Sequence, residues 1–121
     1  MIHISKQMTV KGVQTRVYEY ITNYLEKLGY EIVQKNEPFI VISRKKGQYL
    51  LNNASYELWL TIALAGESFV NVFLDYQLRK ADEAKKSNNG HVMISNSNEI
   101  LSEIEKQYEY LWTLLTKYYT D

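Results

Sequence analysis

The stretch SYELWLTIALAGESFVNVFLDYQL, residues 55–78, sorts its side chains into two classes with a period of two. Large apolar side chains take every second position on each side of a turn at residues 65–68. This set comprises Tyr56, Leu58, Leu60, Ile62, Leu64, Val70, Val72, Leu74, Tyr76 and Leu78. Successive side chains of a β-strand point to opposite faces. The stretch therefore predicts a long antiparallel hairpin, and its aliphatic face needs a cover.

The flanking sequence predicts two helices that supply this cover. An apolar stripe at three- and four-residue spacing runs from Val13 to Leu28, and Gly29 fits a C-terminal cap. A second stripe predicts a helix over about residues 97–119, with Glu99 near the positive end of the helix dipole. Further short strands fit the segments 2–10, 30–34, 39–43, 48–51 and 91–94.

These elements predict one α+β domain over residues 1–121. We expect an antiparallel sheet of about five or six strands, in the order β-α-β-β-(β)-β-β-α. The sheet packs against an N-terminal helix and a long C-terminal helix. The polar segment RKADEAKKSNNG, residues 79–90, has no apolar side chain larger than alanine and predicts a mobile loop.

The order of a strand, a helix, several antiparallel strands and a long C-terminal helix resembles two known topologies. One is the helix-grip domain of the Bet v 1 and START-like proteins, in which a curved sheet wraps the last helix and leaves an apolar cavity. The other is the repeat unit of the TATA-binding protein. The resemblance covers nearly the whole chain and lies in the order of elements, so it implies a fold and transfers no family residue.

Composition argues against several classes of function. Fourteen basic residues balance fourteen acidic ones, so no net field attracts nucleic acid or an anionic membrane. The chain has no cysteine, which excludes disulfides and thiolate chemistry. The N-terminus has no basic segment followed by an apolar run, and no apolar stretch approaches the ~20 residues of a membrane helix. We therefore expect a soluble, cytoplasmic protein.

The inventory of reactive side chains favours a protein that is not an enzyme. His3 and His91 are the only histidines, and neither has a partner at metal-ligand spacing. The two lie near the ends of the predicted first and last strands, where they could meet in space. No nucleophile elbow, phosphate loop or dinucleotide fingerprint is present. We expect no catalytic residues, no metal and no cofactor.

One pair of carboxylates offers a narrower hypothesis. With a turn centred near Gly66, Glu57 and Asp75 would lie nearly opposite each other, flanked by Trp59 and Phe73. Burial would separate their pKa values and make an acid–base pair. The alternative, which we rank first, is that this face of the sheet is simply solvated.

Two function classes remain. The first is a non-enzymatic binding domain that holds a small apolar or amphipathic ligand between the sheet and the C-terminal helix. Its expected ligand-binding residues are Tyr108, Leu111, Trp112, Leu115, Leu60 and Leu74. The simpler interpretation is that the helix tyrosines pack as core and direct their hydroxyls to water at its rim.

The alternative class is a protein–protein interaction module or homodimer that uses the second face of the hairpin. Its expected interface residues are Trp59, Phe69, Asn71 and Phe73. Dimerisation ranks above a cavity lining and above a platform for nucleic-acid bases.

Overall fold

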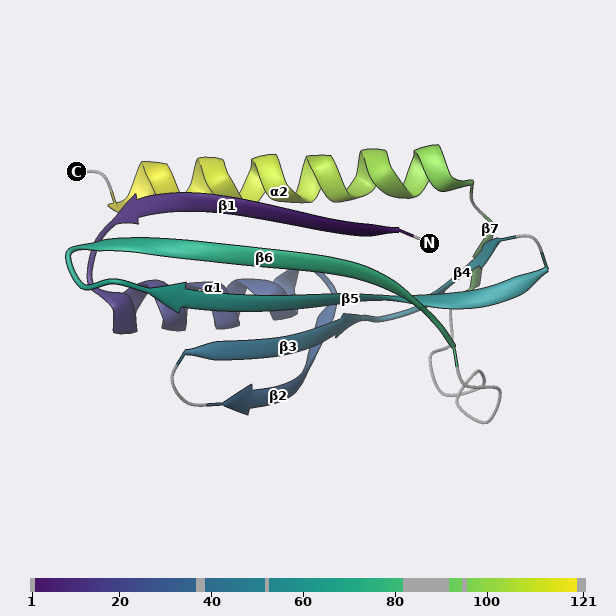
Figure 1. Ribbon diagram of the computed structural model, residues 1–121, viewed down its shortest axis with the longest axis horizontal. Helices are drawn as coiled ribbons and strands as arrows, with labels where there is room; N and C mark the ends of the chain where they lie inside the picture. The colour runs from purple at the N-terminus through teal and green to yellow at the C-terminus, as the bar shows by residue number, and fades with distance from the viewer. Residues whose placement is uncertain (1, 37–38, 52, 82–91, 95, 120–121) are drawn as a thin grey trace.

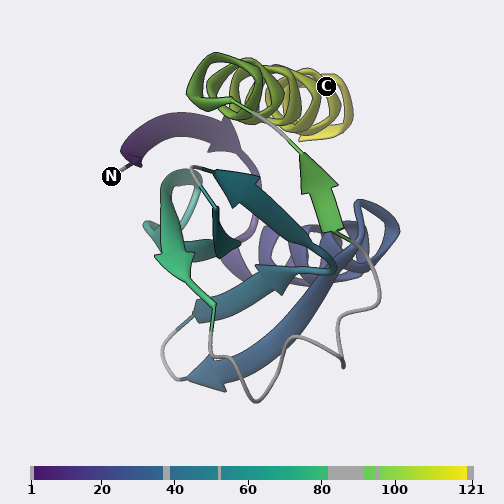
Figure 2. The same ribbon diagram turned by 90° about the vertical axis from the view of Figure 1, so that its right-hand side faces the viewer.

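Both helices lie on one side of a single curved sheet (Figures 1 and 2). The computed structural model describes residues 2–36, 39–51, 53–81, 92–94 and 96–119. The elements are β1 (His3–Lys11), α1 (Gln14–Lys27), β2 (Tyr30–Asn36), β3 (Ile40–Lys45), β4 (Gln48–Leu51), β5 (Ala54–Ala65), β6 (Phe69–Lys80), β7 (Val92–Ile94) and α2 (Ser97–Tyr119). The predicted α+β class, with an antiparallel sheet and two covering helices, is confirmed.

The sheet has the strand order β1-β6-β5-β3-β2, and every pair along this path is antiparallel. The long strand β5 serves two neighbours on one edge: Trp59 pairs with Arg44 of β3, and Tyr56 pairs with Tyr49 of β4. β7 then pairs parallel to β4. Within the described residues six strands pair antiparallel, as predicted, and β7 adds a seventh strand that is parallel to β4.

The predicted aliphatic face of the hairpin is confirmed. Leu58 pairs with Leu78, and Ile62 pairs with Leu74. The members of this set in β5 and β6 are at most 5 % exposed, apart from the partly buried Tyr56. Burial of aliphatic side chains at roughly 25 cal/mol per Å² is the main term that holds a domain of this size together.

The predicted register of the hairpin is wrong: the turn centres on Ser68 instead of Gly66, so each β5 residue pairs four positions further along β6 than expected. Ala65 pairs with Asn71, which leaves five residues between the last paired positions. Gly66 begins this longer connection with a φ of +117°. The carboxylates that the sequence places opposite each other are therefore apart: Glu57 pairs with Arg79, and Asp75 pairs with Thr61.

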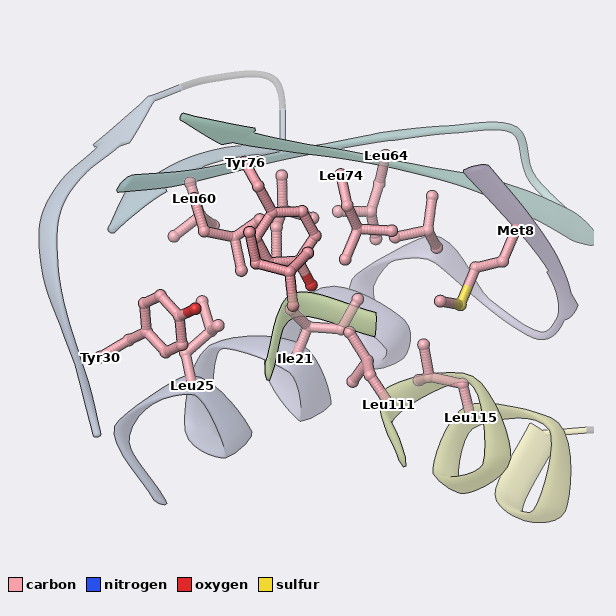
Figure 3. Packing of buried hydrophobic residues seen from close by; sticks show 14 of the residues in the cluster. Met8, Ile21, Leu25, Tyr30, Leu60, Leu64, Leu74, Tyr76, Leu111 and Leu115 are labelled. Carbon is pink, nitrogen blue, oxygen red and sulfur yellow. The ribbon is translucent and has the colours of Figure 1, made fainter. Parts of the chain in front are cut away.

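The two helices fill the inner side of the sheet (Figure 3). Ile21 and Leu25 of α1 and Leu111 and Leu115 of α2 are at most 3 % exposed and join one core with the aliphatic face. Gly29 ends α1 with a φ of +89°, as its predicted role as a cap requires. At the start of α2, the Glu99 backbone N–H donates to Asn96 Oδ1 at 2.9 Å. Asn96 therefore caps the N-terminus of α2 with its side chain.

The predicted mobile loop over residues 79–90 begins two residues too early. Arg79 and Lys80 belong to β6 and pair with Glu57 and Tyr56 of β5. Residues 82–91, which include His91, lie outside the described part of the chain. In the described part, neither helix is long and apolar enough to cross a membrane.

Candidate functional site

The outer face of the sheet is the side away from both helices (Figure 2). It carries the second set of hairpin side chains and the odd-numbered residues of β1, together with Ile40, Ile42 and Arg44 of β3. Two phenylalanines of β6 are conspicuous there: Phe69 is 62 % exposed and Phe73 is 42 % exposed. Large aromatic rings with this exposure on an open sheet face are typical of an interaction site.

Phe73 lies near the middle of this face. It pairs with Gln7 of β1 on one side and with Ala63 of β5 on the other. The half-buried Ile40 of β3 pairs with Ala63 and extends the apolar strip across the sheet. The sequence predicts Phe69, Asn71 and Phe73 on one face, and the alternation of β6 places all three there.

The fourth predicted interface residue, Trp59, is enclosed rather than open. The Arg79 guanidinium lies 4.5 Å from its ring centroid, and that of Arg44 lies 5.6 Å away. Such cation–π contacts contribute about 0.5–1 kcal/mol at exposed sites and more when they are desolvated. Trp59 Nε1 is buried and has no hydrogen-bond partner among the residues that the structure describes. The ring is thus held in place, while Phe69 and Phe73 stand out from the face.

Arg44 also connects two acidic residues of unequal exposure. Its guanidinium is 3.5 Å from Glu57 Oε2 and 3.5 Å from Glu31 Oε2. The Glu57 side chain is 6 % exposed, whereas that of Glu31 is 51 % exposed. The sequence analysis did not find this contact. The phase of β3 was the available signal, because Ile40, Ile42 and Arg44 share a face at a period of two.

Asp75 forms a second polar group on the outer face. Its Oδ1 is 2.6 Å from His3 Nε2 and accepts a hydrogen bond from Ser5 Oγ at 3.0 Å. The predicted meeting of His3 with His91 lies outside the described residues. Among the residues that the structure describes, no three His, Cys, Asp or Glu side chains are placed to hold a metal ion.

A polar network joins the inner side of the sheet to α2. Lys45 Nζ forms an ion pair with Glu103 Oε1 and a hydrogen bond of 3.0 Å to the Tyr49 hydroxyl. Tyr49 donates to Glu103 Oε2 at 2.8 Å, and Tyr30 donates to Gln107 Oε1 at 2.6 Å. Without these hydrogen bonds, the packing of α2 would bury the tyrosine hydroxyl groups without a partner.

Burial in this network shifts the pKa values of several of its residues. It raises the pKa of Tyr49 to about 12 and lowers the pKa of Lys45. Burial, reinforced by Tyr76 and Tyr49, also raises the pKa of Tyr30 well above 10. A desolvated site disfavours the charged form of either residue type, which explains the opposite directions for tyrosine and lysine.

We expect the stability of the protein to fall in alkali because of Tyr49. A raised pKa in the folded state gives a contribution that is fully present below pH 10 and is lost as the pH rises towards 12. The expected slope is up to about 1.4 kcal/mol per pH unit for this one tyrosine. Urea unfolding across this window should show a shallower decline for Tyr49→Phe. Equal slopes for the two proteins would contradict the assignment.

The structure divides the six predicted ligand-binding residues into two groups. Leu60, Leu74, Leu111 and Leu115 are at most 3 % exposed and lie in the packed core (Figure 3). The other two lie at the rim: Trp112 is 47 % exposed, and the partly buried Tyr108 donates to the backbone oxygen of Gln7 at 3.1 Å.

Two pockets among the described residues lie away from these six side chains. One, of about 540 Å³, lies along the first turns of α2 and is lined by Asn96, Asn98, Glu99, Ser102, Glu103 and Lys106. The other, of about 270 Å³, is lined by Ile2, His3, Gln77, Leu78 and Arg79. Neither contains any of the six residues, and a ligand between the sheet and α2 stays a prediction.

Comparison with known proteins found no match: no family model, no curated protein and no solved structure matches this chain. The likeness to the helix-grip and TATA-binding-protein topologies therefore stays a resemblance in the order of elements.

Proposed function

We propose that this chain is a protein–protein interaction module and that the outer face of its sheet binds the partner. The observation that carries the proposal is the exposure of Phe69 and Phe73, at 62 % and 42 %, on the side away from both helices. Burying such rings against a partner removes apolar surface from water, at roughly 25 cal/mol per Å².

The polar residues around these rings support a protein partner rather than a lipid or a nucleic acid. Asn71 accepts a hydrogen bond from Thr9 at 2.8 Å, and Asp75 holds His3 and Ser5. Aromatic side chains interleaved with polar groups match the composition of non-obligate interfaces. Arg44 forms ion pairs with Glu31 and Glu57, so it is not an unpaired cation of the kind that binds nucleic-acid phosphates.

Photo-crosslinking from the outer face tests the proposal. We expect a benzoylphenylalanine in place of Phe73 to crosslink the chain to a discrete protein in cells that naturally express it. The matched control is the same residue in place of Trp112, which lies on α2 and is 47 % exposed, close to the 42 % of Phe73.

Adducts that form from position 73 and not from position 112 would support an interaction face. Equal labelling from both positions, or none from position 73, would overturn the proposal. The mass of the adduct also identifies the partner as another protein or as the same chain.

A further inference from the structure

We infer that the partner is a second copy of this chain, an inference that rests on the proposed function of the outer face. The described residues of this face carry equal numbers of opposite charges. The positive ones are Lys11, Arg44 and Arg79, and the negative ones are Glu31, Glu57 and Asp75. The whole chain is likewise balanced at fourteen and fourteen. A face without net charge does not repel its own copy, and it offers no excess charge to a strongly acidic or basic partner.

The order of residues along β6 is self-complementary about Phe73. Asn71 and Asp75 lie two positions before and after it on the same face. In a two-fold dimer, residue i contacts residue j while j contacts i. An axis across the strands at Phe73 would therefore stack the two Phe73 rings and place each Asn71 amide against the other copy's Asp75.

The hydrogen bonds already present on the face suit this arrangement. Both Ser5 and His3 approach Oδ1 of Asp75. Among the described residues no hydrogen bond to Oδ2 is present, so Oδ2 can accept from a second copy. Asn71 uses its oxygen to accept from Thr9, and within the described part of the chain its amide hydrogens remain for a donor role. The complementary groups of two copies are thus one donor and one acceptor on each side.

The size of the face suits a dimer at the lower end of the usual range. Four strands, β1, β6, β5 and β3, lie about 4.8 Å apart and average about 30 Å in length, so together they present roughly 600 Å². Two such faces would bury roughly 1,200 Å², which is the lower limit for stable, specific protein interfaces. We therefore expect a dimer that dissociates on dilution.

Light scattering and crosslinking of the purified chain test the inference. The mass should rise from one chain towards two with concentration, and Phe73→Asp should abolish the rise. Gln7 pairs with Phe73 and would face its own copy across the axis. The chain has no cysteine, so Gln7→Cys should give a covalent dimer with a short bifunctional thiol reagent. The control, Ser102→Cys on the exposed side of α2, should not.

Charge variants of Asn71 test the arrangement. Asn71→Asp would place two like-charged pairs across the interface, and we expect the dissociation constant to rise about 10-fold or more. Asn71→Lys would create two opposite-charged pairs and should lower it. Unchanged constants would overturn the antiparallel arrangement. A chain that stays monomeric at its highest soluble concentration would overturn the second copy as partner, while a position-73 adduct with a different protein would still support the interaction face.

Discussion

Replacing Gly66 with alanine is expected to lower the free energy of unfolding by about 3 kcal/mol, measured by urea denaturation at equilibrium. Gly66 has a φ of +117°, a region that side-chain-bearing residues rarely occupy. A Cβ built on it would lie 2.2 Å from the backbone oxygen of Phe69. Because that atom belongs to the backbone, the connection between β5 and β6 has to move, and the register of both strands depends on it.

Gly29→Ala is the matched control. Gly29 also has a positive φ, of +89°, but nothing lies within 4 Å of an added Cβ. Its loss should be limited to the backbone strain, about 1 kcal/mol. If the two variants lost the same small amount, the connection at Gly66 would be free to relax, and the five-residue turn would not fix the register.

The faces of the hairpin were predictable from the sequence, and its register was not. Alternation over residues 56–64 and 70–78 assigns each side chain to a face whatever the length of the connection. The register depends on which residues close the turn, and several loop lengths fit the segment Ala65–Phe69. The error of four positions in the pairing is an even number, so it preserved both faces while it separated Glu57 from Asp75.

The candidate site was predictable to a similar depth. The exposed positions of Phe69 and Phe73 follow from period two in β6. The ion pair of Arg44 with the buried Glu57 does not, because it depends on where β3 lies along β5. The contact of Lys45 with Glu103 joins positions 58 residues apart, and no local pattern in the sequence relates them. Long-range pairings of this kind come from tertiary packing, and the periodicity of a strand carries no information about them.

Replacing Leu74 with alanine should lower the free energy of unfolding by about 3–4 kcal/mol. Leu74 is 1 % exposed and lies on the inner face between Lys6 of β1 and Ile62 of β5. In Figure 3 it points with Leu64 towards the side occupied by the helices. Removing its branched end from a close-packed core costs the transfer of those atoms and the cavity they leave. Urea unfolding measures the loss.

This substitution also bears on the predicted ligand site, for which Leu74 is one of the expected residues. Ile42→Ala is the control, since Ile42 is half-buried on the outer face and should lose about 1 kcal/mol. A Leu74→Ala loss close to that of the control would mean that Leu74 borders unfilled space, as an apolar ligand site between the sheet and α2 requires. The full loss would mean that its side chain is supported on all sides, so a ligand could enter only if α2 moved away from the sheet.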